Sequence, residues 1–414
     1  MEHSKLPIEL CERIMDVLSP GPPSLGSLSI GQHEIELLQA QHALHALSAC
    51  ALTCRAWRPR AQFVLWTHPQ FDDDAVVVAF TQVLRSVSPS FGHHVSTLVL
   101  CARPVGFRSL SRPGDVFLLS LPNLRNLCLS SLRFDYLPVP PHMRTRLRLC
   151  ENVTRLQLVN CEFLAIRIMF NIIWSCPDLR SLGIWRCFIP EESSDDEFAR
   201  VTQASRHFHA CRALTQLQIE IGNRPNIPLH ISGGAFGLSL TSLTLIYLMF
   251  KFEHVPRLEP FPHLRDLELL IHSGYVSPFH PGEEPFLHEL VRNLHAPTRL
   301  ERISMHTYHR TTRRDCERLF GTADTADPDH VVCSLLPSLR VLEIGLEGSH
   351  GSDSLDGLSS CASYVMSVLP SMCDVIVLED DHGGRIQLRC LHSLDTRTGQ
   401  SSPSSALALG SHSG

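Results

Sequence analysis

The sequence predicts an α/β fold in which strand, loop and helix units stack into a solenoid, preceded by a short helical domain at the amino terminus. A six-residue apolar pattern, Φ-x-x-Φ-x-Φ, recurs ten times, and 62 of the 414 residues are leucine. Residues 1–66, by contrast, space their apolar residues as helices do. With 43% hydrophobic and 19% charged residues, the chain can bury a large core.

Residues 1–66 form the predicted helical domain. Pro7 suits the first position of a helix. One apolar stripe of this helix consists of Leu10, Ile14, Val17 and Leu18. An insertion at about residues 19–41 follows and is expected to be a loop; its first part is rich in Pro, Gly and Ser, and a second helical stretch is expected from about His33.

The solenoid is expected over residues 67–394. The central apolar residue of the repeated pattern stands at Leu98, Leu127, Leu156, Leu182, Leu217, Leu243, Leu267, Ile303, Leu342 and Val375. Apolar residues two positions apart point to one face of a strand. One strand cannot bury that face alone, whereas stacked copies share a continuous core. Two copies extend to a longer form that ends in Cys161 and Cys187.

Helices are expected between the strands. Capping residues and amphipathic spacing predict them at 72–87, 284–295 and 311–320, and from Ser194 toward Cys211. The last twenty residues, 395–414, are rich in Ser and Gly, so they are expected to be a disordered tail.

Several classes of protein are excluded or disfavoured by composition and motifs. The net charge of −6 argues against binding to nucleic acid or a membrane surface. Only Lys5 and Lys251 are lysines, and neither belongs to a phosphate-binding loop or a kinase strand. The fifteen cysteines include no C-x-x-C pair, which favours reduced, structural thiols. We therefore expect a protein without catalytic residues, a metal or a cofactor. The expected location is cytoplasmic and/or nuclear. An enzyme built on a Cys/His pair is the remaining alternative.

The amino-terminal residues resemble an F-box, in the form common among large fungal families. The motifs are Leu-Pro-x-Glu-Leu-x-x-x-Ile from Leu6, Leu-x-x-Cys-x-Leu-x-Cys-Arg-x-Trp from Leu47, and an apolar close at Leu65-Trp66. The resemblance implies docking on the Skp adaptor of a cullin-RING ubiquitin ligase. By matching position, the residues that contact the adaptor or pack behind the contact are Leu6, Pro7, Leu10, Ile14, Leu52, Cys54 and Trp57.

Residues 92–392 resemble the leucine-rich repeat family in its irregular form. Together with the F-box motifs, this resemblance implies the substrate-recognition subunit of an SCF-type E3 ubiquitin ligase. A leucine-rich interaction scaffold with no role in ubiquitin ligation is the alternative.

A protein substrate is expected on the strand face, where side chains alternate with the core leucines. These side chains belong to Arg155, Gln157, Trp185, Gln216, Gln218, Glu220, Asp266, Glu268, Arg302, His306 and Glu343. Trp185 has the composition of an interface anchor, although packing under a neighbouring loop explains it equally well.

Overall fold

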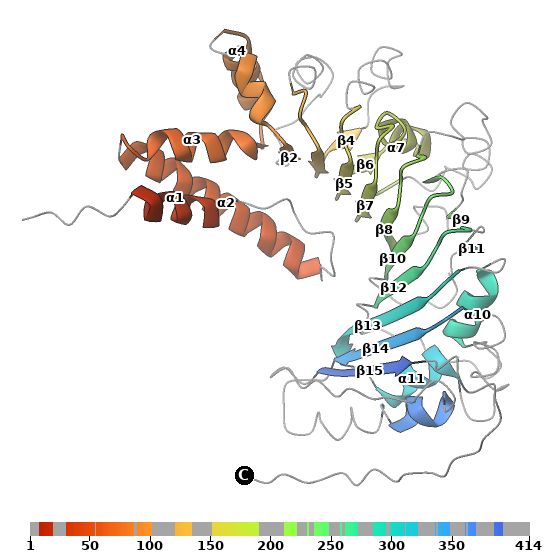
Figure 1. The fold of residues 1–414 in the computed structure, drawn as a ribbon. Coiled ribbons are helices and arrows are strands. Elements are labelled where there is room, and N and C mark those ends of the chain that lie inside the picture. Colours follow the sequence, from red (N-terminus) through yellow and green to blue (C-terminus); the bar gives the residue numbers. More distant parts are fainter. Residues whose placement is uncertain are drawn as a thin grey trace, which may run out of the picture.

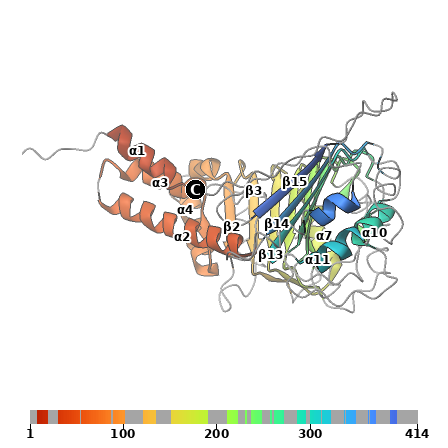
Figure 2. The ribbon, with the colours of Figure 1, turned by 90° about the horizontal axis from the view of Figure 1, so that it is seen from below.

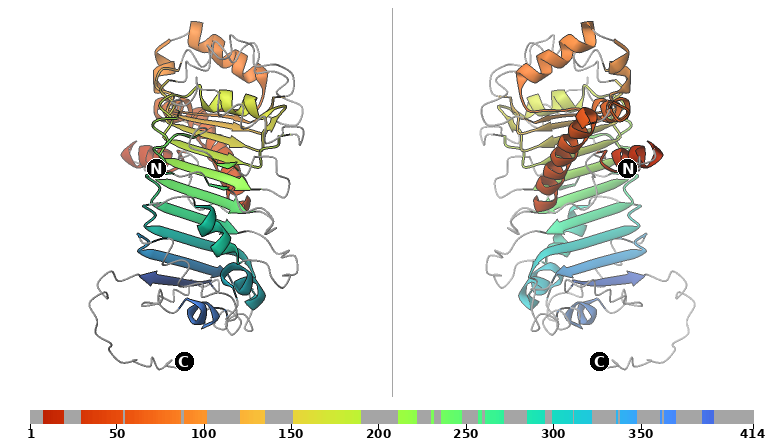
Figure 3. Two further views of the ribbon diagram at one scale, coloured as in Figure 1. Left: turned by 90° about the vertical axis from the view of Figure 1, so that its right-hand side faces the viewer. Right: turned by 90° about the vertical axis from the view of Figure 1, so that its left-hand side faces the viewer.

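The computed structural model describes residues 8–19, 30–53, 55–86, 89–101, 121–134, 151–189, 211–221, 230–231, 236–247, 257–258, 261–271, 285–294, 299–310, 312–321, 336, 338–347, 361, 363–369 and 385–391. A curved sheet forms the body of the molecule (Figure 1). The helices between strands lie on its outer side, and three amino-terminal helices lie on its inner side (Figures 2 and 3). The architecture is α/β with a mostly parallel sheet of stacked repeats, as predicted.

The three amino-terminal helices are α1 (Ile8–Val17), α2 (Ile30–Thr53) and α3 (Arg58–Thr67). The expectation of a loop over residues 19–41 is wrong for its second part, because residues 30–41 form the first turns of α2. From Gln32 onward this stretch contains no Pro or Gly and consists mostly of good helix formers, so the insertion lengthens a helix.

These helices have a small core of their own. Its buried members are Cys11, Met15, Leu47, Ala61 and Val64. Trp57 is partly buried against this cluster. An ion pair of 2.6 Å between Asp16 and Arg60 joins α1 to α3 at the surface. Trp66, near the end of α3, packs on the solenoid core and not on this small cluster. The predicted boundary at residue 66 therefore falls inside a helix that contributes to both the amino-terminal domain and the solenoid.

The main sheet has eleven strands in the order β1-β2-β3-β5-β7-β8-β10-β12-β13-β14-β15. The bounds are β1 (Gln70–Phe71), β2 (Thr97–Cys101), β3 (Asn126–Ser130), β5 (Arg155–Val159), β7 (Ser181–Trp185), β8 (Gln216–Ile221), β10 (Ser242–Tyr247), β12 (Asp266–Ile271), β13 (Arg302–Arg310), β14 (Val341–Glu347) and β15 (Arg385–Leu391). Neighbouring strands are parallel except β14 and β15, which are antiparallel.

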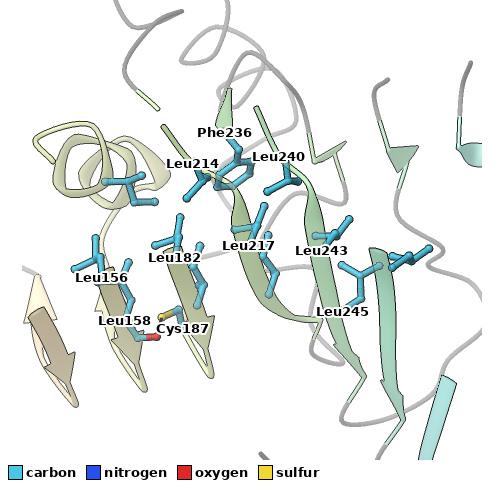
Figure 4. Close-up of a cluster of buried hydrophobic side chains, with 14 of the residues drawn as sticks. Leu156, Leu158, Leu182, Cys187, Leu214, Leu217, Phe236, Leu240, Leu243 and Leu245 are labelled. Atoms are coloured by element: carbon cyan, nitrogen blue, oxygen red, sulfur yellow. Dashed lines mark hydrogen bonds between the residues drawn. The ribbon is translucent and has the colours of Figure 1, made fainter. Parts of the chain in front are cut away.

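The repeated pattern sets the register of these strands. Leu98 pairs with Leu127, Leu127 with Leu156, and the alignment continues without stagger to Leu342. Leucines of successive strands point to the same side and pack into one core (Figure 4). Nine of the ten predicted strands are therefore confirmed. The tenth, centred on Val375, lies outside the described residues, and the short β1 and the antiparallel β15 were not predicted.

Three repeats leave their strand through the same unusual backbone conformation. Ser131, Asn160 and Arg186 occupy equivalent positions and have φ angles of 55°, 51° and 48°. This left-handed conformation turns the backbone N–H toward the neighbouring strand. The N–H of Ser131 donates to the carbonyl of Val159, and that of Asn160 to the carbonyl of Trp185, both at 2.8 Å.

The two cysteines that extend the pattern follow this turn and are buried. Cys161 Sγ lies 3.3 Å from the carbonyl oxygen of Leu129, and Cys187 Sγ lies 3.5 Å from that of Leu158. Each thiol therefore bonds to the main chain of the preceding strand. This contact explains why the pattern places a small polar side chain at this position.

The described helices of the solenoid are α4 (Asp74–Ser86), the 3-10 helix η1 (Pro89–His94), α7 (Ile166–Ile173), α10 (Phe286–Asn293), α11 (Arg313–Phe320) and a helical stretch over 363–368. Asp73 caps α4 by accepting the N–H of Ala75 at 2.8 Å. Thr312 and Asp315 form a capping box on α11. The sequence did not predict α7. The helix predicted from Ser194 and the predicted tail lie outside the described residues.

Four short strands run alongside the solenoid. They are β4 (Arg133–Phe134), β6 (Glu162–Phe163), β9 (His230–Ile231) and β11 (Arg257–Leu258). They pair as β4 with β6 and β9 with β11, both in parallel. In the part of the chain that the structure describes, no helix is long and apolar enough to cross a membrane.

Candidate functional site

The inner face of the sheet carries the side chains that alternate with the core leucines. Because side chains on a strand alternate between faces, residues one position away from each core leucine point away from the core. In the register of the strands they form a row through Gln157, Gly183, Gln218, Thr244 and Glu268, which continues to Ser304 and Glu343. We call this the middle row of the inner face.

Trp185 lies on this face and folds back over its own strand. Atoms of its indole ring occupy the place where a side chain at Gly183 would begin: a Cβ on Gly183 would lie 2.7 Å from Cζ2 of Trp185 and closer still to Cη2 and Cζ3. The ring therefore takes the middle-row position of β7. Trp185 is half-buried, and it packs on the inner face of the sheet itself.

The indole separates two glutamines. Gly183 pairs with Gln157 on one side and with Gln218 on the other, and both glutamines are nearly fully buried, at 2% and 4% exposed. Both polar atoms of the Gln218 amide are buried and have no hydrogen-bond partner among the described residues. A buried amide without a partner costs about 1–3 kcal/mol, so such a group in a folded protein calls for an explanation.

Charged side chains gather on the later strands of the same face. Thr244 Oγ1 donates to Glu268 Oε2 at 3.0 Å. Arg302 forms an ion pair with Glu343, whose carboxylate also accepts from Ser304 Oγ at 3.3 Å. This group places two carboxylates and one guanidinium on three successive strands.

The two carboxyl groups differ in proton affinity. Burial raises the pKa of Glu268 above its usual value, against the opposing effects of the Thr244 hydrogen bond and the charge of Arg302. Burial acts in the same direction on Glu343, but the hydrogen bond and charge of Arg302 outweigh it and lower the pKa of that group. Arg302 thus pairs directly with Glu343 and acts on Glu268 through its charge alone, which does not outweigh the effect of burial there.

Glu220, on β8, is a further carboxyl group of this face and is buried, at 7% exposed. Burial raises its pKa to about 7, although Arg186 lowers it through its charge and a backbone hydrogen bond. At neutral pH this group is therefore poised between its neutral and charged forms.

A separate apolar surface lies on α1. Cys11 and Met15 face the small core, whereas Ile8, Leu10 and Ile14 are 42–48% exposed. Val17, on the same helix, and Leu52, near the end of α2, are more than 80% exposed. The predicted stripe is therefore divided: Leu18 packs on the core, and Leu10, Ile14 and Val17 point outward.

The sequence-predicted site residues fall into these two surfaces. Arg155, Gln157, Trp185, Gln218, Glu268, Arg302 and His306 all lie on strands of the inner face. Gln157 and Gln218, however, are buried there. Of the predicted adaptor-binding residues, Leu10, Ile14 and Leu52 are exposed and Trp57 is partly buried. The other three predicted residues, Leu6, Pro7 and Cys54, lie outside the described residues.

Sequence reasoning missed the contributions of Gly183, Thr244 and Ser304 to the inner face. Their alternation with core leucines was a signal that would have found them, because each stands between two apolar residues of the repeated pattern. Among the described residues, no group of His, Cys, Asp or Glu is arranged to hold a metal ion, and the ten cysteines whose side chains the structure describes form no disulfide.

Comparison with known proteins gives little further information. No protein-family model matches the chain, and no curated protein matches it. Among solved structures, a leucine-rich repeat protein of Leptospira interrogans is similar over 61% of this chain and 74% of its own length, with 12% sequence identity and a TM-score of 0.26. The solenoid architecture is therefore assigned from the strand register and core of this chain.

Proposed function

We propose that the chain is a protein-interaction scaffold, and more specifically the substrate-recognition subunit of an SCF-type E3 ubiquitin ligase. The amino-terminal helices bind a Skp-type adaptor and through it a cullin-RING ligase, while the inner face of the solenoid binds a protein substrate. Such a subunit acts by proximity, because it holds substrate lysines near the ubiquitin-loaded E2.

The outward face of α1 is the observation that carries the adaptor proposal. Leu10, Ile14 and Val17 are exposed although Cys11 and Met15 of the same helix anchor it to a core. An amphipathic helix needs one apolar face to fold, and a second exposed apolar face favours binding to a partner. The resemblance to an F-box favours an adaptor contact at two of these positions, Leu10 and Ile14.

A pull-down with a Skp-type adaptor tests this proposal. The full chain is expected to retain the adaptor, and the double variant Leu10→Ala/Ile14→Ala is expected to lose at least tenfold in retention with an unchanged melting temperature. A matched control is Leu164→Ala/Phe188→Ala, which removes two exposed apolar side chains from the solenoid. Failure of the wild-type chain to retain the adaptor, or equal retention by the two double variants, would refute the adaptor role.

A second candidate is a scaffold without any role in ubiquitin ligation, in which the amino-terminal helices cap the solenoid. The packing of Trp66 favours it: the indole stacks on Phe80 at 4.9 Å and on Phe91 at 5.1 Å between ring centroids. A helix whose end is built into the solenoid core shields the first repeat from solvent. Adaptor retention separates the two candidates.

A further inference from the structure

Charge is divided unevenly along the inner face. The inward positions of β2 to β7 between Thr97 and Trp185 include no carboxylate. Those of β8, β10 and β12 carry three carboxylates, from Glu220, Asp266 and Glu268, and no basic side chain. On β13 and β14 carboxylates and basic side chains occur together, as in the pair of Arg302 and Glu343. The part of this surface over β8 to β12 is therefore acidic.

Glu220 is buried and Glu268 is half-buried, and neither forms an ion pair among the described residues, although the charges of Arg186 and Arg302 act on them. Glu343 is neutralised by Arg302, and it also stands opposite Arg389 in the register of β14 and β15. Glu220 and Glu268 lie two strands and two residues of register apart, on β8 and β12, which corresponds to about 12 Å at the usual strand spacing and rise. Long basic side chains from one extended segment can reach both positions, because residues i and i+2 of an extended chain are about 7 Å apart.

The unpartnered amide of Gln218 is an independent sign of a missing ligand. On one side its middle-row neighbour is the indole of Trp185, which offers no hydrogen bond from its benzene ring. On the other side is Thr244, whose hydroxyl hydrogen is donated to Glu268. A peptide group offers one acceptor and one donor, which are the two partners that the Gln218 amide lacks.

We propose that the inner face over β7 to β12 binds an extended segment of a partner protein that carries Lys or Arg side chains. The basic side chains pair with Glu220 and Glu268, and a peptide group of the segment bonds to the Gln218 amide after the half-buried indole of Trp185 turns aside. Side-chain rotations of this kind are common when interfaces form. The proposal deepens the proposed function, since it specifies the chemistry of the protein bound by the solenoid.

Binding of three fluorescein-labelled twelve-residue peptides to the full chain tests the proposal by fluorescence anisotropy. The peptides are Gly/Ser-based, and one carries four lysines, one four glutamates and one no charge. We expect the lysine peptide to bind most tightly and its affinity to fall as salt rises, because salt screens the attraction between the acidic face and the approaching basic peptide. Preference for the neutral or the acidic peptide would overturn the proposal.

Two pairs of variants locate the binding. Glu220→Gln/Glu268→Gln is expected to weaken lysine-peptide binding at least tenfold, whereas Glu12→Gln/Glu151→Gln, which removes the same charge from exposed positions, leaves it unchanged. Equal weakening by both pairs would reveal attraction by net charge alone and refute the site.

Gln218→Leu adds a readout that separates binding from folding. Because the amide is already unpartnered, this variant is expected to keep or raise the melting temperature while it weakens peptide binding at least threefold. Unchanged binding would remove Gln218 from the proposed site. Adaptor retention by these variants is measured alongside, so failure of the basic-segment proposal is distinguishable from failure of the adaptor proposal.

Discussion

The indole of Trp185 occupies the space that the absent side chain of Gly183 leaves on the inner face of the sheet. A tryptophan can fold flat across its own strand only where the residue two positions earlier has no Cβ in its path. The pair therefore determines the shape of the surface between Gln157 and Gln218. A substitution at either position therefore alters the surface that a binding partner would contact.

Gly183→Ala is expected to push the indole off the sheet. The added methyl group overlaps the ring, and because the ring is the far end of a rotatable side chain, the cost is expected to be about 1 kcal/mol in the free energy of unfolding. Tryptophan emission is expected to shift to longer wavelength and to become more accessible to acrylamide. In a Trp185→Phe background, the same substitution should leave the emission unchanged; a shift there would assign the effect to another tryptophan.

Glu220 is expected to make stability depend on pH. Its pKa is about 7 in the folded protein, above the usual 4.5 of a glutamate, so the folded state binds more protons between these values. The free energy of unfolding therefore falls as pH rises through this window, by at most about 3 kcal/mol from this group, and levels off above pH 7. Burial raises the pKa of Glu268 as well, with the same sign of effect.

Glu220→Gln removes this dependence. Urea unfolding at pH 5, 6, 7 and 8 is expected to show the variant gaining stability relative to the wild type at each step. Glu12→Gln, at an exposed position of α1, provides the control, with a difference from the wild type that stays flat. A flat difference for Glu220→Gln would contradict the raised pKa.

The core leucines are expected to dominate stability. Leu156 is fully buried in the register that runs from Leu98 to Leu342, and Leu156→Ala should lower the free energy of unfolding by about 3 kcal/mol. Leu164, only eight residues away, is 55% exposed, and Leu164→Ala should cost less than about 1 kcal/mol. Similar losses from both substitutions, measured by urea unfolding, would contradict the placement of Leu156 in the core.

Strand positions were predictable because the physics behind them is local and repeated. Leu182 and Ile184 are two positions apart on a strand, so they point to the same face of the sheet whatever surrounds them. The register then follows because equivalent residues of successive repeats pair with one another. The two strands at the edges of the main sheet were harder to predict. β1 is only two residues long, and Arg385–Leu391 alternates as a strand without revealing that it runs antiparallel to its neighbour.

The inner face was predictable in position but not in exposure. Alternation assigns Gln157 and Gln218 to that face, and it would leave both accessible. Both are nearly fully buried, and so are Thr244, Ser304 and Glu343 of the same row, because side chains on the concave face of a curved sheet crowd one another. Alternation along one strand does not show this crowding. The exposed side of α1 has a similar cause: apolar spacing identified the stripe, but whether Leu10 or Cys11 meets the core depends on where α2 and α3 pack.

Trp66 is expected to couple the amino-terminal helices to the solenoid. Its indole stacks between Phe80 and Phe91 at the end of α3, whereas Trp57, nine residues earlier, packs on the small helical core. Trp66→Ala removes a stacked ring from a partly buried site, so a loss of about 3 kcal/mol is expected.

Hydrogen exchange followed by mass spectrometry identifies the segments that lose stability in this variant. Trp66→Ala should raise exchange both in α3 and in α4, because the stack joins these helices, while Trp57→Ala should raise it within α1 to α3 alone. Identical exchange patterns for the two variants would mean that the helices and the first repeats unfold as one unit, with Trp66 having no special role in joining them.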